Sequence, residues 1–458
     1  MESIVKKVET TAKIVFSNGT EYTIPFKNDK SLTDDLQNYG TSCSLKERLY
    51  QSDSTSIIGN ICSNTLTIEL MSKDKKLISS NKQSPYYGYM NNSAVVYISA
   101  LGDDGVTTNM GKYYIDAWEN GASYDNSTVV TLTASDLFGR IKNVNIGKVR
   151  LKEHITFSSY LINVIKALNK NLSVDMQIKY IQSEIQKLDS IYSTDWQMWY
   201  NNIERNDLET ILNTIAKNTM TYIWIDRSDT LRVDCMLDDE TEQIACELSG
   251  SKNLFSYSVN NSDIYTYNGV KTKYISNVSY SDQEVLNLND YSLVKGMNTI
   301  TANLNTDKCI DVHSIEIECD NGTAKCISFY SFRDTIEMQV VSDYDAVASI
   351  KVYGKVIQES YDTYINKDYT SGALLEIENN IMCGKSNIEK FTDNFANMIA
   401  MENAQVQAEG YINPQLSLGA MVNMQGSKLE IASKYKVAGL EFKFGSGYRC
   451  VVTLIKTI

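Results

Sequence analysis

The sequence has little proline, little histidine and no long apolar run. Only 3 of its 458 residues are Pro and 2 are His. No stretch approaches the roughly 18 apolar residues that a membrane-spanning helix needs, so we expect no stable membrane insertion. The opening stretch MESIVKKVETTAKIV also lacks the continuous apolar core of a signal peptide. We therefore expect synthesis in the cytoplasm.

The scarcity of histidine argues against the commonest catalytic and metal sites. A Ser-His-Asp or Cys-His site would have to use His154 or His313. Neither lies in a G-x-S-x-G motif or beside a cysteine placed to act as a nucleophile, and the zinc motif H-E-x-x-H is absent. We expect structural roles for both histidines. The sequence assigns no catalytic, cofactor-binding or metal-binding residue, which favours a structural protein over an enzyme.

Cysteine is present, but no two cysteines form a C-x-x-C pair. The sequence therefore indicates neither a zinc site nor a dithiol redox motif. We expect most of the cysteines to be small, buried and reduced. They are Cys43, Cys62, Cys235, Cys246, Cys309, Cys319, Cys326, Cys383 and Cys450.

Basic clusters are missing as well. The longest basic run is KDKK at 73–76, and 56 acidic residues outnumber 43 Lys and Arg, for a net charge of −13. A surface that grips phosphates needs clustered Lys and Arg, which argues against specific binding of nucleic acid. An acidic surface would still let DNA slide past, because like charges repel.

One stretch matches the second half of a phosphate-binding loop. Gly384-Lys385-Ser386 fits the end of G-x-x-x-x-G-K-[ST], but Asn379 occupies the place of the first glycine. Without that glycine the loop cannot bring its backbone N–H groups around a phosphate. We therefore interpret Gly384 as a turn residue and Ser386 as a helix cap, with Glu389 completing a capping box.

Two other groups of side chains leave a choice open. Paired carboxylates could serve a glycosidase, which needs two of them at a set separation, but acidic turns have the same composition. A cluster of aromatic residues could stack on a sugar or anchor a partner, or it could pack a helix. The acidic groups are Asp34-Asp35, Asp103-Asp104 and LDDETE (237–242), and the aromatic residues are Trp196, Trp199 and Tyr200.

Residues 1–145 show the period of two that is typical of strands. In KIVFSNGTEYTIPF (13–26), alternating runs flank Asn18-Gly19, which is a strong hairpin signal. Between about 150 and 220 the period moves toward the 3.6 of a helix. Helices are predicted over 157–170, 176–192, 206–218 and 386–404; strands over 64–70, 94–101, 111–134 and in several runs between 241 and 370, with a hairpin around Arg227–Asp229 and two closing strands.

Candidate caps mark two of the helix starts. Ser135 or Asp136 is placed to cap a short helix, because its side chain can accept bonds from free backbone N–H groups. Asn206 is the expected N-cap of the helix over 206–218, with Glu209 three residues later. Many short strands with such helical interruptions predict a mainly β protein with inserted helices, of the α+β class.

Four stretches resemble the tail hub (baseplate hub) proteins of tailed bacteriophages and related contractile particles. Together they follow the family's order over most of the chain. Segments 171–200 and 306–345 match nothing in that pattern, and Gly419-Ala420 stands where the family has Gly-Asp. The stretches are GKYYIDAWENG…VVTLTASDLFGRI (111–141), NDLETILNTIAKNTMTYIWIDRSDTLRV (206–233) with Asp226 and Asp229 in its turn region, YTYNGVKTKY (265–274), and the strand–helix–strand region 374–447.

The resemblance implies a structural virion protein without catalytic activity, cofactor or metal. Hub proteins form a threefold ring in which each subunit contributes two tube-like β-barrels, so that the trimer imitates the sixfold tail tube. The ring adapts the tube to a tip or spike and forms part of the channel for DNA ejection. The implied partners are two further copies of the chain, the tail tube protein, the tape-measure protein and the tip or spike protein, and the implied location is the tail tip or baseplate of the virion.

The resemblance also suggests how the chain is divided. The expected parts are a first tube-like barrel (1–150), a helix-rich insertion ending in a hairpin (151–240), a second β domain (241–370), and a helix with closing strands (371–458). Two rival functions remain. One is a tail-associated peptidoglycan hydrolase, although we expect no additional domain between the hub region and Ile458. The other is a glycan-binding tail adhesin that uses the Trp/Tyr cluster.

In the family pattern, NPQLSLGAMVNMQG (413–426) is a turn that leads into a barrel strand. Pro414 fixes its φ angle and ends strand pairing on its N-terminal side. Gly419 is free to adopt a positive φ as the next strand begins. The period of two places Met421 and Asn423 on one face of that strand. The residues with core periodicity are Val422, Met424, Val437 and Leu440.

Overall fold

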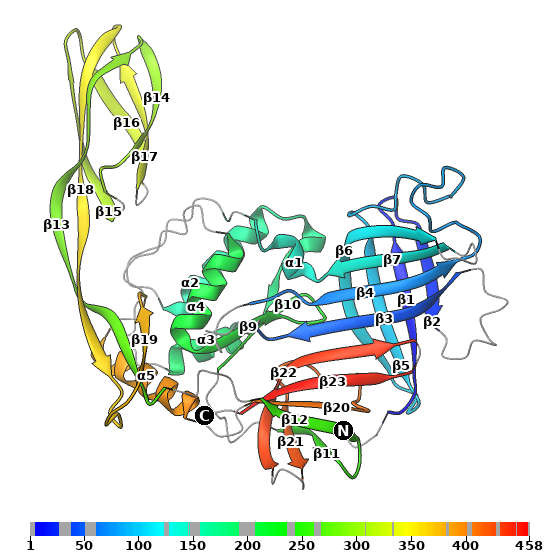
Figure 1. The fold of residues 1–458 in the computed structure, drawn as a ribbon. Coiled ribbons are helices and arrows are strands. Elements are labelled where there is room, and N and C mark those ends of the chain that lie inside the picture. The colour runs from blue at the N-terminus through cyan, green and yellow to red at the C-terminus, as the bar shows by residue number, and fades with distance from the viewer. Residues whose placement is uncertain are drawn as a thin grey trace.

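The protein is mainly β with inserted helices, as the sequence predicts. The structure is a computed structural model. It describes residues 5–26, 38–50, 61–122, 128–144, 146, 156–191, 207–235, 243–260, 267–306, 308–331, 334–381, 384–400, 405–426, 431–445 and 447–456. These residues form a closed barrel, a half-barrel, a helical unit and a long arm (Figure 1).

The closed barrel has seven strands. Its order is β3-β2-β1-β5-β6-β7-β4, and β4 pairs back onto β3 to close the ring. Alternate residues point inward, so Ala12, Ile14 and Ile24 are fully buried in its core. The strands are β1 (Val8–Val15), β2 (Glu21–Phe26), β3 (Asn38–Arg48), β4 (Thr65–Ser72), β5 (Val95–Gly102), β6 (Thr107–Ala122) and β7 (Thr128–Ser135).

The hairpin predicted at Asn18-Gly19 is confirmed. Gly19 has a φ of +81° between β1 and β2. The side chain of Asn18 accepts hydrogen bonds from the backbone N and the Oγ1 of Thr20, at 3.0 and 2.7 Å. The turn therefore fixes the register of the first two strands.

The half-barrel is an open sheet of six strands that continues from the closed barrel. Strand β22 pairs with β3 from Gly439↔Arg48 to Phe444↔Cys43, so one sheet runs through both units. This unit is open, and it takes two strands from the range 241–370 and four from the range 371–458. The predicted core residues Val422, Met424, Val437 and Leu440 are buried in it, which confirms their assignment. Its order is β11 (Ile244–Ser249), β21 (Met421–Gly426), β22 (Ile431–Phe444), β23 (Arg449–Ile455), β20 (Gln405–Gly410) and β12 (Leu254–Asn260).

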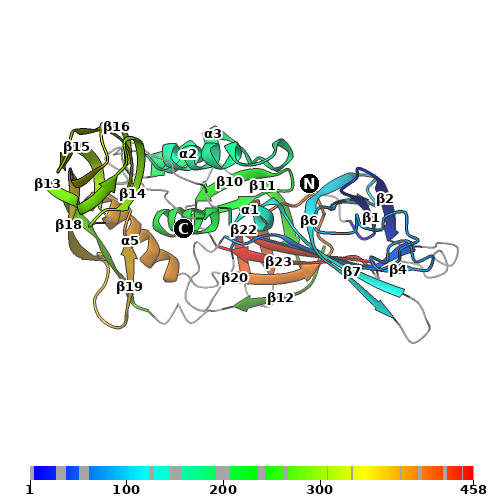
Figure 2. The same ribbon diagram turned by 90° about the horizontal axis from the view of Figure 1, so that it is seen from above.

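The helical unit lies between the closed barrel and the arm (Figures 1 and 2). Its three-stranded sheet has the order β8-β10-β9, and the predicted hairpin around Arg227–Asp229 is confirmed by the pairing of β9 with β10. The elements are α1 (Leu137–Ile141), α2 (Phe157–Lys170), α3 (Gln182–Ile191), α4 (Leu208–Thr219), β8 (Lys179–Tyr180), β9 (Thr221–Ile225) and β10 (Thr230–Cys235).

Helix α3 begins six residues later than the prediction over 176–192. The side-chain amide of Asn169 accepts from the backbone N of Ile178 and donates to its backbone O, both at 2.9 Å. These two bonds fix Ile178 outside any helix, and Lys179–Tyr180 then pairs with β10. The side-chain amide of a residue nine positions earlier therefore overrides the helical period of this segment.

Of the predicted helix caps, one is confirmed and two are wrong. Asp136 caps α1 by accepting from Gly139 N at 3.0 Å. Helix α4 is capped by Asp207, which accepts from Thr210 N at 2.7 Å, and not by Asn206. Helix α5 (Lys385–Ile399) starts after Gly384, whose φ is +88°, so Ser386 lies inside the first turn and not at the N-cap position. Glu389 lies 3.8 Å from Lys385 instead of forming a capping box.

The arm rises from the far end of the molecule (Figure 1). Its backbone is a long antiparallel ribbon of β13 and β18, and α5 packs at its base. The outer half has an apolar core of its own around Ile350, Val352 and Met338. The two sheets are β15 (Cys309–Cys319), β18 (Ala346–Ile365), β13 (Gly269–Leu293) and β19 (Leu374–Asn379), and β14 (Gly296–Asn303), β17 (Thr335–Ser342) and β16 (Ala324–Ser331).

Candidate functional site

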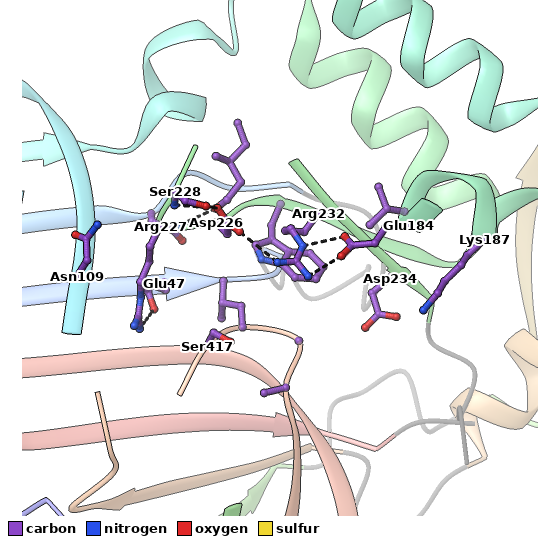
Figure 3. Close-up of a pocket in the computed structure, with 17 residues that line it drawn as sticks. Glu47, Asn109, Glu184, Lys187, Asp226, Arg227, Ser228, Arg232, Asp234 and Ser417 are labelled. Carbon is purple, nitrogen blue, oxygen red and sulfur yellow. Dashed lines mark hydrogen bonds and ion pairs between the residues drawn. The ribbon is translucent and has the colours of Figure 1, made fainter. Parts of the chain in front are cut away.

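A cavity of about 510 Å³ lies where the closed barrel, the helical unit and the half-barrel meet (Figure 3). Glu47 and Asn109 line it from the barrel, the β9–β10 hairpin and Glu184 line it from the helical unit, and the segment 417–420 lines it from the half-barrel. Charged side chains of both signs therefore converge where these three structural units meet.

Arg227 is the central side chain of this junction. Its Nε and Nη2 atoms each donate to a carboxylate oxygen of Glu47 on β3, both at 2.7 Å. Glu47 exposes 2% of its side chain and Arg227 exposes 15%. Burial lowers the pKa of Arg227, but the Glu47 carboxylate more than offsets this, and the net pKa is raised. The pair is a buried, bidentate ion pair of the strongest kind.

The same guanidinium also holds the half-barrel. It donates to the carbonyl oxygens of Pro414 and Leu416, at 2.7 and 3.1 Å, and lies 5.4 Å from the ring centre of Phe442. Pro414 stands in a tight turn in which Leu416 N donates to Asn413 O at 2.9 Å. The predicted turn before the next strand is thus confirmed, and its carbonyl groups are held by an arginine from another unit.

A second tie joins β10 to the half-barrel. Lys436 on β22 exposes only 1% of its side chain, and its ammonium group donates to Asp234 at 2.5 Å and to the carbonyl of Cys235 at 3.4 Å. Buried lysine is rare unless it is paired. Two cations therefore join the helical unit to the half-barrel: Arg227 comes from the helical unit, and Lys436 comes from the half-barrel.

Arg232 and Asp226 order the hairpin itself. Arg232 makes a bidentate pair with Glu184 of α3, at 2.8 and 2.7 Å, and reaches Asp226 at 3.3 Å. Asp226 accepts from the backbone N–H groups of Ser228 and Thr230, while Asp229 adopts a φ of +61°. Asp226 and Asp229 thus shape the turn that presents Arg227 to Glu47.

Gly419 is required at the wall of the cavity. Its φ is +78°, and a Cβ at this position would lie 2.9 Å from Cη2 of Trp224. We expect Gly419→Ala to lower the free energy of unfolding by about 1–3 kcal/mol, because backbone strain and this close contact add together. Gly105 has the same φ with open space around it. Gly105→Ala is the control in urea unfolding, and an equal loss in both variants would contradict a role for Trp224.

Asp136 is the most perturbed carboxyl group near the junction. Burial raises its pKa to about 7, although hydrogen bonds from the backbone N–H groups of Asn64 and Gly139 oppose the shift. Asn64 itself lines the cavity and donates to the carbonyl of Ile225 at 3.3 Å. Asp136 is therefore a buried connector between the barrel and the hairpin.

Most of the residues singled out in the sequence lie away from the cavity. His313 is exposed on β15 in the arm. Asp103 and Asp104 shape a turn, where they accept from Lys6 N at 3.2 Å and from Val106 N at 3.1 Å, so the acidic-turn interpretation holds for this pair. Outside the described residues are His154, Asp34-Asp35, the acidic stretch 237–242, and Trp196, Trp199 and Tyr200.

Fewer of the described cysteines are buried than we expected. Cys43, Cys309 and Cys450 are fully buried, and the other five lie at intermediate exposure. Burial raises the pKa of Cys43 and Cys62 to about 12, so neither thiol is ionised near neutral pH. Cys383 lies outside the described residues.

The junction is chemically suited to holding units together. Its cations bind carboxylates and backbone carbonyl oxygens of other units at hydrogen-bonding distance. Within the ranges that the structure describes, no group of three or more His, Cys, Asp and Glu side chains could hold a metal ion. In the same ranges, no helix is both long enough and apolar enough to cross a membrane.

Sequence reasoning missed Glu47, Arg227 and Lys436. A signal was present, because Glu47 shares the inward face of its strand with Cys43 and Leu45. A carboxylate at an inward position needs a cation, but nothing local indicates that the cation comes from residue 227.

Solved structures of tail proteins are similar to this chain over its whole length, although no family model matches it and no curated protein matches its sequence. The 43 kDa tail protein of prophage MuSo2 from Shewanella oneidensis has a TM-score of 0.52 at 10% identity, with 98% of each chain covered. The tail protein from Neisseria meningitidis MC58 has a TM-score of 0.51 at 9% identity, with 98% of this chain and 96% of that chain covered. The chain therefore has the fold of these tail proteins, which is the fold that the resemblance to tail hubs led us to expect.

Proposed function

We propose that the protein is the structural hub of a phage tail or of a tail-like particle. The observation that carries this proposal is the single sheet that runs from a closed barrel into a half-barrel, joined where β22 pairs with β3. Two tube-like units in one subunit are what a threefold ring needs in order to continue a sixfold tube. The tail proteins of the same fold support this assignment.

The open half-barrel supports assembly into a ring. Strands β11 and β12 each pair on one side only within the described sheet. A free strand edge exposes backbone N–H and C=O groups that another chain can satisfy. In the proposed homotrimer, neighbouring copies cover these edges, and the rings of tube protein above and of tip or spike protein below complete the tail.

The proposed lumen conducts the tape-measure protein and DNA without binding DNA specifically. The net charge of −13 favours the passage of a polyanion over its retention. We assign no catalytic role, because the charged groups at the junction act as ties between structural units. The protein would act in the virion, at the tail tip or baseplate.

Mass photometry and negative-stain imaging of the purified chain test the proposal. We expect an annulus with a central hole and the mass of three copies of the 51.6 kDa chain. The same sample should release no soluble fragments from peptidoglycan. A compact monomer that stays monomeric when the tube protein is added would contradict the hub, and muralytic activity would favour the hydrolase.

A further inference from the structure

The tip of the arm carries a group of exposed apolar side chains, here called the tip cluster. Its members are Val294, Met297, Tyr344 and Val347, which expose 61%, 57%, 55% and 40% of their surface. They lie at the turn between β13 and β14 and around the turn between β17 and β18. Both turns lie at the end of the arm that is farthest from the helices and barrel (Figure 1).

The turns under the tip cluster are held by hydrogen bonds. Asp345 accepts from Lys295 N at 2.7 Å, and Asp320 accepts from Val347 N at 2.8 Å. Thr323 donates to the carboxylate of Asp343. The tip cluster is therefore presented on ordered backbone rather than on a free loop, which lowers the entropy cost of binding.

The ring of Tyr344 is itself held in place. A Cβ at Gly322 would lie 2.5 Å from Cδ2 of Tyr344, so the ring packs directly on that glycine. The ammonium group of Lys295 lies 5.8 Å from the ring centre. A fixed, half-exposed tyrosine beside methionine and valine has the composition of an interface centre.

Exposed apolar surface is concentrated on the arm. Of the 19 large apolar side chains exposed among the described residues, ten lie between Tyr280 and Ile365. Monomeric proteins rarely leave such groups together in water unless they bind a partner. The arm is thus the part of the described surface that is best suited to docking.

The charge of the arm restricts what can dock there. Residues 269–379 contain 17 Asp and Glu against 9 Lys and Arg, which is a net −8 out of the chain's −13. Three of the acids, Asp320, Asp343 and Asp345, lie in the tip turns. This field repels DNA, anionic lipid and a second copy of the same acidic chain, and it attracts a basic surface.

We propose that the tip cluster is a docking site for a second protein, whose contact surface is apolar at its centre and rimmed by Lys and Arg. Tyr344 and Met297 enter the apolar centre, and the three aspartates face the basic rim. The proposal does not depend on the hub function, because it follows from the arm alone.

An amphipathic helical peptide made of Leu and Lys is the probe, and its binding to the full-length chain is measured by fluorescence anisotropy. We expect Tyr344→Ser to weaken binding at least about tenfold. We expect Asp343→Asn with Asp345→Asn to weaken it about tenfold at low salt and to remove most of its salt dependence, because Asn keeps the hydrogen-bond acceptors and loses the charge.

Matched variants elsewhere separate docking from general stickiness. Val174→Ser removes an apolar side chain that is 85% exposed on the helical unit, and Glu9→Gln with Glu119→Gln removes two exposed charges from the barrel. Both should leave binding unchanged, and melting curves should show that every variant is folded. The proposal is overturned if the Leu/Lys peptide binds the tip variants as tightly as it binds the wild type. It is also overturned if a Leu/Glu peptide binds with the same affinity as the Leu/Lys peptide. Binding to anionic vesicles that the tip variants weaken, or self-association that Tyr344→Ser abolishes, would overturn it as well.

Discussion

Replacing Arg227 by Met is expected to lower the free energy of unfolding by about 3–5 kcal/mol. The substitution keeps much of the side-chain volume but leaves the Glu47 carboxylate buried without its cation. It also removes the donor to the carbonyl oxygens of Pro414 and Leu416. Urea unfolding followed by tryptophan fluorescence measures the loss, since Trp224 lines the same cavity.

A matched pair of variants separates the buried charge from lost packing. Arg227→Met combined with Glu47→Leu should be more stable than Arg227→Met alone, because the buried carboxylate that lost its cation is then removed as well. Arg227→Lys should recover only part of the loss, since an ammonium group cannot form two parallel bonds to one carboxylate. If Arg227→Met lowers the free energy of unfolding by less than about 1 kcal/mol, the Arg227–Glu47 pair contributes no more than an exposed surface pair. That result would contradict its role in holding the units together.

The second large effect concerns Asp136 and pH. Its pKa of about 7 in the folded protein lies above the 3.8 of an unperturbed Asp, so folding favours the neutral acid. The resulting stability is fully present below about pH 4 and is lost as the pH rises to about 7. A shift of this size corresponds to at most about 4 kcal/mol. Asp136→Asn cannot titrate, so wild-type stability relative to this variant should fall across that range.

Melting temperatures of the two proteins between pH 4 and pH 8 test this expectation. Asp207 caps α4 and Asp136 caps α1, each by accepting a hydrogen bond from a backbone N–H group, but Asp207 is not buried. Asp207→Asn is therefore the control for loss of a cap charge. A constant difference between the wild type and Asp136→Asn across the range would show that Asp136 does not titrate there.

Local patterns predicted the elements well wherever the local chemistry also decides the structure. Asn18-Gly19 and Arg227–Asp229 are turns, and α2 spans the predicted residues 157–170. In each case the signal and the force that acts lie within a few residues. Period two also identified Val422 and Met424 as core residues, because alternation alone decides which face of a strand is buried.

The wrong predictions of helix starts and caps share one cause, which is competition from a nearby residue that the sequence pattern does not reveal. The helix over 176–192 lost its first turns to the amide of Asn169. Asp207 and Asn206 are adjacent and have similar capping strength, so sequence alone could not choose between them. Ser386 gave way to a glycine with positive φ.

The junction could be predicted only in part. Inward positions for Glu47 and Lys436 can be read from alternation, and each demands a partner of opposite charge. The partners lie about 180 and 200 residues away, at Arg227 and Asp234, and no periodicity links such positions. The arm escaped prediction for a related reason, since its alternating runs do not tell whether they pair with one another or with the barrel sheet.

The order of strands in the half-barrel has a consequence for how a nascent chain matures. Strand β23 follows all the other described strands in sequence, yet it lies between β20 and β22. The barrel strands are neighbours in sequence and can close while synthesis continues, because domains generally fold as they emerge. In the half-barrel, in contrast, β20 and β22 are joined only through β23, so this sheet is complete only after β23 has paired with both. A chain that lacks β23 would leave one edge of β20 and one edge of β22 without a neighbouring strand, and such exposed edges favour aggregation.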